Sequence, residues 1–161
     1  MWKIIHKFGS PPWFFRFATK AVQWLLPLML IALAVGCVWG LLYAPPDFRQ
    51  GNSYRIIFIH VPAAVVALAG YYVMAFAGLV SLVWKIKMAD VAMRAVAPVG
   101  AALTFVALVT GAIWGKPTWG TWWVWDARIT SMLILLFLYL GVVALFEAYE
   151  NPDRKSTRLN S

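Results

Sequence analysis

The stretch VPAAVVALAGYYVMAFAGLVSLVW, from Val61 to Trp84, contains no charged side chain. A helix rises about 1.5 Å per residue, so about 20 apolar residues are needed to cross the roughly 30 Å hydrocarbon core of a bilayer. The stretch is longer than that. It therefore predicts a helix that spans a membrane.

Three further apolar runs lie along the chain, from Val22 to Leu42, from Val96 to Trp114 and from Ile129 to Phe146. Apolar residues make up 63% of the sequence and charged residues 12%, too few to cover a water-soluble domain. β-Strands are not expected, because an open sheet edge leaves backbone groups unpaired in lipid and these runs lack the alternating pattern of a barrel. We predict an all-α integral membrane protein with four transmembrane helices.

The length of the chain allows one integral domain, which we place at residues 1–150, followed by an unstructured tail at 151–161. Small residues inside the runs predict close contacts between helices. These are Gly36, Gly40, Gly70, Gly78, Gly100, Gly111 and Gly141. Aromatic and basic residues between positions 2 and 20 favour a segment along the membrane interface, although an ordinary basic flank with anchoring aromatics explains them equally well. No cleavable signal peptide is expected there.

The basic residues predict the orientation of the helices. Ten of them flank one side, in the N-terminal segment, the second connection and the tail: Lys3, Lys7, Arg16, Lys20, Lys85, Lys87, Arg94, Arg154, Lys155 and Arg158. Four flank the other side: Arg49, Arg55, Lys116 and Arg128. By the positive-inside rule the N-terminus is cytoplasmic and the third connection faces the periplasm. The net charge of +8 does not predict a nucleic-acid partner, because the cations form no continuous stripe.

The third connection is unusually rich in tryptophan. Residues 114–128 hold five of the ten tryptophans of the chain: Trp114, Trp119, Trp122, Trp123 and Trp125. Indole rings clustered at a membrane surface offer flat faces on which a planar aromatic ligand can lie. His60 begins the second helix, and two membrane crossings separate it from this connection, so both lie on one side. A neutral imidazole is a good ligand for haem iron, and the combination predicts a haem site.

Each of these residues also has a plainer interpretation. His60 alone would bond to a backbone carbonyl or to water, and any single tryptophan would belong to an aromatic belt. Asp126 is predicted to cap the fourth helix at its N-terminus. Arg128, Arg55 and Lys116 are candidates for binding the haem propionates, but lipid phosphate is the more common partner of such cations. Cys37, the only cysteine, is interpreted as a small apolar side chain inside a helix.

The sequence from Trp119 to Arg128 resembles the tryptophan-rich WWD signature, Trp-Gly-x-Trp-Trp-x-Trp-Asp-x-Arg, of haem-handling proteins in cytochrome c assembly. The flanking strings narrow the resemblance to the heme exporter protein C (CcmC) family. These are residues 1–3, 43–47, 50–57, 60–64, 93–98 and 108–111, in the order of the family. The resemblance covers residues 1–149, and its motifs are specific because several separate strings agree.

The resemblance implies that the protein binds haem b at the periplasmic face of the bacterial inner membrane. It implies that His60 is an axial ligand of the iron and that the five tryptophans with Asp126 hold the haem. The implied partners are a periplasmic haem chaperone of the CcmE type, ABC transporter subunits and a small single-helix subunit. The sequence contains no nucleotide-binding Gly-x-x-x-x-Gly-Lys-Ser/Thr loop, so ATP hydrolysis is expected to belong to a partner, and we expect no enzymatic activity.

The sequence departs from the family pattern after the fourth run. The resemblance implies a protein with six helices and a second periplasmic histidine, so this chain is interpreted as C-terminally truncated. Two other functions are kept as alternatives. A transporter that moves haem through the bundle would need ligand-capable side chains deep in the helices. A structural subunit of the assembly complex would use its tryptophans only for anchoring and for recruiting partners.

Overall fold

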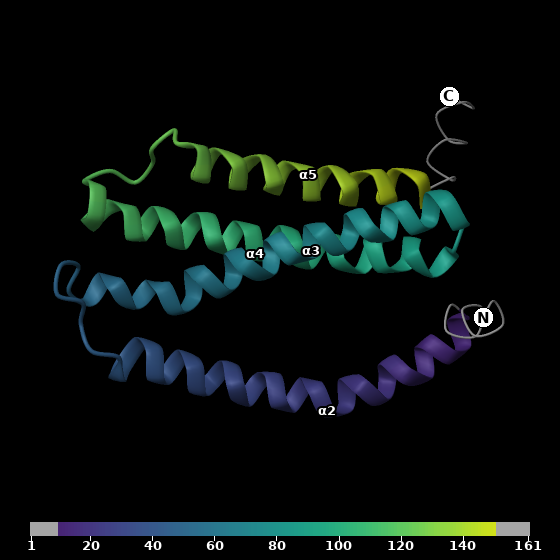
Figure 1. Ribbon diagram of the computed structural model, residues 1–161, viewed down its shortest axis with the longest axis horizontal. Helices are drawn as coiled ribbons and strands as arrows, with labels where there is room; N and C mark the ends of the chain where they lie inside the picture. Colours follow the sequence, from purple (N-terminus) through teal and green to yellow (C-terminus); the bar gives the residue numbers. More distant parts are fainter. Residues whose placement is uncertain (1–9, 151–161) are drawn as a thin grey trace, which may run out of the picture.

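The computed structural model describes residues 10–150, and these form four long helices with no β-strand beyond a single bridge between Asp47 and Gly51 (Figure 1). Helix α2 spans Pro11–Val38 and continues as a π-helical turn, η1, at Trp39–Tyr43. A 3₁₀ turn, η2, at Asn52–Ile56 leads into α3, Ile57–Trp84. Helices α4 and α5 span Lys87–Trp119 and Ala127–Glu150.

All four helices are long and apolar enough to cross a membrane, which confirms the predicted all-α class. The tail at 151–161, predicted to be unstructured, lies outside the described residues, as do residues 1–9. Residues 11–20 form the first turns of α2 and not a separate element. Prolines are tolerated at this start because the backbone N–H groups of the first helical turn have no acceptor within the helix. Pro27 lies inside α2, which is visibly bent (Figure 1).

The helices extend beyond the apolar runs that predicted them. Helix α3 begins at Ile57 because the 3₁₀ turn before it already supplies helical geometry, so Pro62 lies inside the helix. Helix α4 continues to Trp119, which shortens the predicted connection from 114–128 to the residues between Trp119 and Ala127. The helix ends where Gly120 adopts a left-handed conformation, with φ of 78°, the usual glycine stop signal.

Helices α3, α4 and α5 pack around Tyr139, which is completely buried. Its ring fills the space left by Gly70 on α3 and Gly100 on α4, and its hydroxyl donates a hydrogen bond to the carbonyl of Ala67 at 2.6 Å. Lipid tails are as apolar as the helix surfaces, so no hydrophobic effect drives membrane helices together. They associate through close packing of this kind. The close contacts predicted at small residues are therefore present at these two glycines.

Other glycines in the predicted set differ in their surroundings. Gly40 lies against Phe58, Gly78 against Met93 and Gly111 against His60. A side chain added at Gly36 or Gly141 would meet nothing within 4 Å, so the prediction of a close contact is wrong at these two positions. Their helix faces point away from the neighbouring helices, which sequence periodicity did not reveal.

Helix α2 lies beside the three-helix group and is attached to it mainly at one end (Figure 1). None of its residues is buried. The attachment uses the π-helical turn, where Gly40 lies against the Phe58 side chain of α3. Most of the α2 surface is therefore left for lipid or for a partner.

The connections α2–α3 and α4–α5 lie together at one end of the molecule, and the short α3–α4 connection lies at the opposite end (Figure 1). We call the first of these the tryptophan end, defined by residues 44–56 and 120–126. His60, in the first part of α3, belongs to this end. The prediction that His60 and the tryptophan-rich connection share a side is confirmed.

Candidate ligand-binding site

A cavity of about 370 Å³ lies at the tryptophan end between α3, α4 and α5. Helix α3 contributes His60, α4 contributes Trp114 and Trp119, the connection contributes Trp123, and α5 contributes Arg128. All five were predicted as site residues. The fold thus gathers the imidazole, three of the five indoles and one cation around a single cavity.

His60 is partly buried and is held on three sides. Its Nδ1 lies 3.1 Å from the Thr110 hydroxyl. Its ring and the Trp114 ring form a T-shaped pair, with centroids 5.7 Å apart and planes inclined by 72°. Gly111 gives the ring its space, because a Cβ at that position would lie 3.0 Å from the His60 Cε1 atom. The imidazole therefore packs closely against one face of α4.

Trp114 is tied to the first connection of the tryptophan end. Its indole N–H donates a hydrogen bond of 2.6 Å to the side-chain oxygen of Gln50, which also lines the cavity. Gln50 is held in a tight turn, where its own N–H and that of Arg49 donate to the Asp47 carboxylate, each at 2.8 Å. These two bonds hold the pKa of Asp47 below its usual range. The turn positions Gln50 as part of the cavity wall.

The other tryptophans differ in their exposure. Trp119 lies over Gly115, where a Cβ would come within 3.2 Å of the indole ring. Trp123 has a buried indole N–H, and no hydrogen-bond acceptor for it is found within residues 10–150. Trp122 is 57% exposed and Trp125 is 75% exposed, and neither lines the cavity. The five indoles therefore do not form one continuous floor.

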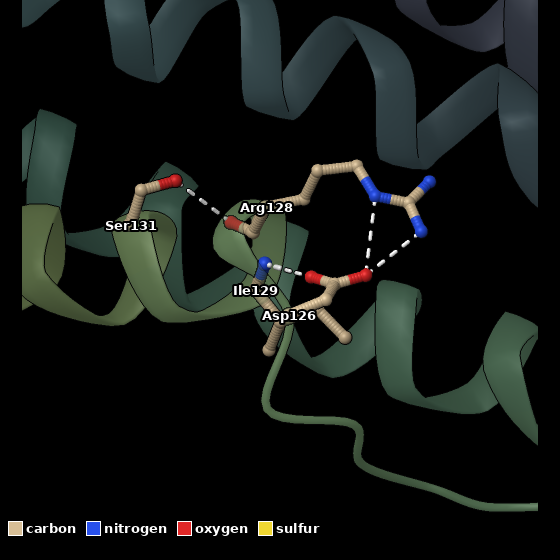
Figure 2. Close-up of polar contacts among 4 residues, drawn as sticks. All are labelled: Asp126, Arg128, Ile129 and Ser131. Atoms are coloured by element: carbon tan, nitrogen blue, oxygen red, sulfur yellow. Dashed lines mark hydrogen bonds and ion pairs between the residues drawn. The ribbon is translucent and has the colours of Figure 1, made fainter.

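Asp126 caps helix α5, as predicted (Figure 2). Its Oδ1 accepts the backbone N–H of Ile129 at 2.9 Å, and its Oδ2 accepts the Arg128 guanidinium at 2.8 Å. The Ile129 bond and then the Arg128 partner lower the pKa of Asp126. Arg128 also lies over the Trp119 ring, 5.1 Å from its centroid. Asp126 thus positions a cation at the cavity without lining the cavity itself.

A pH-dependent stability is expected from Asp126. A carboxyl with a lowered folded pKa stabilises the fold above its unfolded pKa of about 3.9, and this contribution is lost as the pH falls through the lower folded value. We expect Asp126→Asn, which keeps a capping oxygen but has no charge, to melt below the unsubstituted chain at neutral pH. The difference should disappear in acid. Thermal unfolding in detergent between pH 3 and pH 7 measures it, and a constant difference across that range would contradict the assignment.

Arg55 and Lys116 were also predicted to lie near a ligand. In the structure both donate hydrogen bonds to backbone carbonyls of their own end of the molecule. Arg55 donates to the carbonyls of Ala44 at 3.0 Å and Leu41 at 3.1 Å, so it satisfies the end of η1, and it does not line the cavity. Lys116 donates to the Gly120 carbonyl at 3.0 Å at the end of α4. Among the predicted cations, the cavity is therefore lined only by Arg128.

Gln50, Thr110 and Gly111 were not predicted from the sequence as site residues. The signal for Gly111 was available, because positions 107, 111, 114, 115 and 118 repeat at helical spacing and all of them line the cavity. Thr110 lies beside this face. Gln50 had no comparable signal, because its contact with Trp114 joins residues 64 positions apart.

The fold and the site together define a multi-span helical membrane protein with an imidazole and indole cavity at one end. The family model described as heme exporter protein C matches residues 4–160, and the chain belongs to this family. It is 52% identical to the heme exporter protein C of Escherichia coli K12 over 151 residues, and 53% identical to that of Haemophilus influenzae over 153 residues. The corresponding protein of Bradyrhizobium diazoefficiens is 47% identical over 146 residues.

These alignments cover nearly all of this chain but only part of each relative. The shares of this chain are 94%, 95% and 91%, and the shares of the relatives are 62%, 62% and 55%, in the same order. The chain therefore spans less than two thirds of the length of the relatives that it matches.

Proposed function

We propose that this chain binds haem b at the periplasmic face of the bacterial inner membrane and presents it to a haem chaperone during c-type cytochrome maturation. The observation that carries the proposal is the cavity in which His60, three indoles and Arg128 meet. The names of the relatives, heme exporter protein C, point to the same ligand. The proposal assigns the chain a role in binding and presentation, not in catalysis.

The groups around the cavity suit a haem. An imidazole is a common axial ligand, and a haem so held supplies an iron that a second histidine can also bind. Indole rings offer apolar faces to a porphyrin, and Arg128 is placed for a propionate carboxylate. The unpartnered N–H of Trp123 is a donor on a side chain that lines the cavity, so an acceptor on the ligand would satisfy it. A cavity of about 370 Å³ lies within the range of small-molecule sites, roughly 300–1,000 Å³.

A weakly held axial ligand favours transfer of the haem over permanent storage. Among residues 10–150, His60 is the histidine that lines the cavity. A chaperone histidine can then compete with His60 for the iron. We propose a CcmE-type periplasmic chaperone as the recipient.

The surroundings of the cavity support the proposed partners and orientation. Exposed Trp122 and Trp125 lie beside the cavity residue Trp123 and are available to the chaperone or to lipid. The almost fully exposed α2 leaves a long face for lipid or for other subunits, which we propose to be the ABC transporter subunits and the small single-helix subunit. Only four of the fourteen cations flank the tryptophan end, which by the positive-inside rule supports a periplasmic tryptophan end and a cytoplasmic N-terminus.

Presentation at the membrane surface is favoured over passage of haem through the bundle. Apart from the Tyr139 hydroxyl, Thr104 is the only buried polar side chain in the described part of the chain. Its hydroxyl donates to the Gly100 carbonyl at 2.7 Å and is already satisfied. A haem route between α3, α4 and α5 would need ligand-capable groups at this depth, where the helices instead pack around Tyr139.

Removing the Trp123 indole N–H tests the proposal against a purely structural role. We expect Trp123→Phe, which keeps an aromatic ring, to weaken haem binding about 10- to 150-fold, because a hydrogen bond to a charged acceptor contributes about 1.5–3 kcal/mol. The measurement is haem titration of the chain in lipid nanodiscs, followed at the Soret band. Trp122→Phe is the matched control, since Trp122 is exposed and does not line the cavity. Equal affinity of both variants and the unsubstituted chain would favour the structural role.

A further inference from the structure

We propose that Thr110 is a positioning residue that holds His60 as the Nδ1–H tautomer and so leaves the Nε2 lone pair free for a metal. The inference rests on the proposed haem site, because it gives that site a second residue behind its ligand. Thr110 lies on α4, and His60 lies 50 positions earlier on α3.

The hydrogen bonds of Thr110 determine which way the proton lies. Its hydroxyl oxygen is 2.7 Å from the Val106 carbonyl and 3.2 Å from the Ala107 carbonyl. Carbonyl oxygens only accept, so the one hydroxyl proton is directed to the helix backbone. Toward the imidazole, at 3.1 Å, the Thr110 oxygen then acts as an acceptor. We therefore assign His60 as the donor, with the proton on Nδ1.

Packing keeps the ring in this orientation. The His60 Cε1 atom faces Gly111, and the Trp114 ring packs against the imidazole in a T-shaped pair. Turning the ring over would take Nδ1 away from Thr110 and leave it without its hydrogen bond in a partly buried site. The same face of α4 thus supplies the space, the aromatic contact and the acceptor.

The consequence for ligand binding is chemical. An imidazole that donates through Nδ1 has an unprotonated Nε2, which is the form that coordinates iron. Removing a supporting group of this kind typically lowers metal affinity about 10- to 100-fold. Thr110 needs no contact with the haem to have this effect.

The tautomer can be measured without haem. In chain labelled with ¹⁵N-histidine and carrying His6→Gln, only His60 contributes histidine ring signals. We expect the NMR spectrum to show a protonated Nδ1 and an unprotonated Nε2. Thr110→Val, which replaces the hydroxyl by a methyl group, should shift the population toward the Nε2–H tautomer, and Thr110→Ser should restore the original spectrum. An unchanged tautomer in Thr110→Val would overturn the inference.

Haem titration separates this inference from the proposed function. We expect Thr110→Val to bind haem about tenfold more weakly, with a changed iron–histidine vibration in the resonance Raman spectrum, and Thr110→Ser to behave like the unsubstituted chain. Thr104→Val is the matched control, since Thr104 also bonds back to its own helix but lies in the core. If His60→Ala weakens binding while Thr110→Val does not, the role of Thr110 is refuted. If His60→Ala changes nothing, the haem site itself is refuted.

Discussion

Replacing His60 by alanine is expected to lower haem affinity on the order of 100-fold and to shift the Soret band, because the substitution removes the only imidazole that lines the cavity. A group at the centre of a binding site typically carries about 2–4 kcal/mol, which corresponds to a factor of this size. Residual binding should remain, since the indole faces and Arg128 are unchanged. Titration of haem into the chain in nanodiscs, with absorption spectra of both redox states, measures the effect.

Two controls make the result specific to the imidazole. His6→Ala changes the second histidine of the chain and should leave both the affinity and the spectrum unchanged. Imidazole added to the buffer should enter the space left in His60→Ala and restore the original Soret position. If His60→Ala bound haem with the original affinity and spectrum, His60 would not belong to the site.

Placing a methyl group at Gly100 is expected to destabilise the three-helix group by about 1–3 kcal/mol, the usual cost of overpacking. The Cβ of Gly100→Ala would lie 2.2 Å from the Cε1 and Cζ atoms of Tyr139. An aromatic ring cannot bend away, and the Tyr139 hydroxyl is held by the Ala67 carbonyl. Helices α4 and α5 must therefore separate locally. Thermal unfolding of the chain in detergent, followed by circular dichroism, measures the loss.

Gly141→Ala is the matched control for the crowded glycine. It makes the same chemical change in a transmembrane helix, at a position where the added Cβ would meet nothing within 4 Å. Its unfolding temperature should equal or exceed that of the unsubstituted chain, because alanine favours helix more than glycine does. Equal losses in both variants would mean that glycine flexibility, and not the contact with Tyr139, explains the effect.

The structural class was predictable because it depends on the composition of single segments. An apolar run such as Val61 to Trp84 is long enough to cross lipid, and a backbone in lipid must satisfy its hydrogen bonds within a helix. Helix ends were less predictable. The extension of α4 to Trp119 and the start of α3 at Ile57 depend on local turns, which hydropathy does not register.

The candidate site was predictable only in part. The tryptophan motif and His60 indicated where a ligand would bind, and Asp126 was predicted as the cap that it proves to be. Which indoles reach the cavity was not predictable, because Trp122, Trp123 and Trp125 lie in an irregular connection without a periodic pattern. Arg55 illustrates the same limit, since its guanidinium is used by the backbone carbonyls of η1.

By itself the sequence determined that four helices cross a membrane and that His60 and the tryptophan-rich connection share one side, because the number of crossings between two residues decides their side. Only the tertiary structure decided that Thr110 stands behind His60 and Gln50 beside Trp114, contacts that join residues 50 and 64 positions apart. Such contacts depend on how each helix is rotated about its axis and on where it crosses its neighbour. The close approach of α3, α4 and α5 around Tyr139 sets that rotation, which cannot be inferred from the sequence of any one helix.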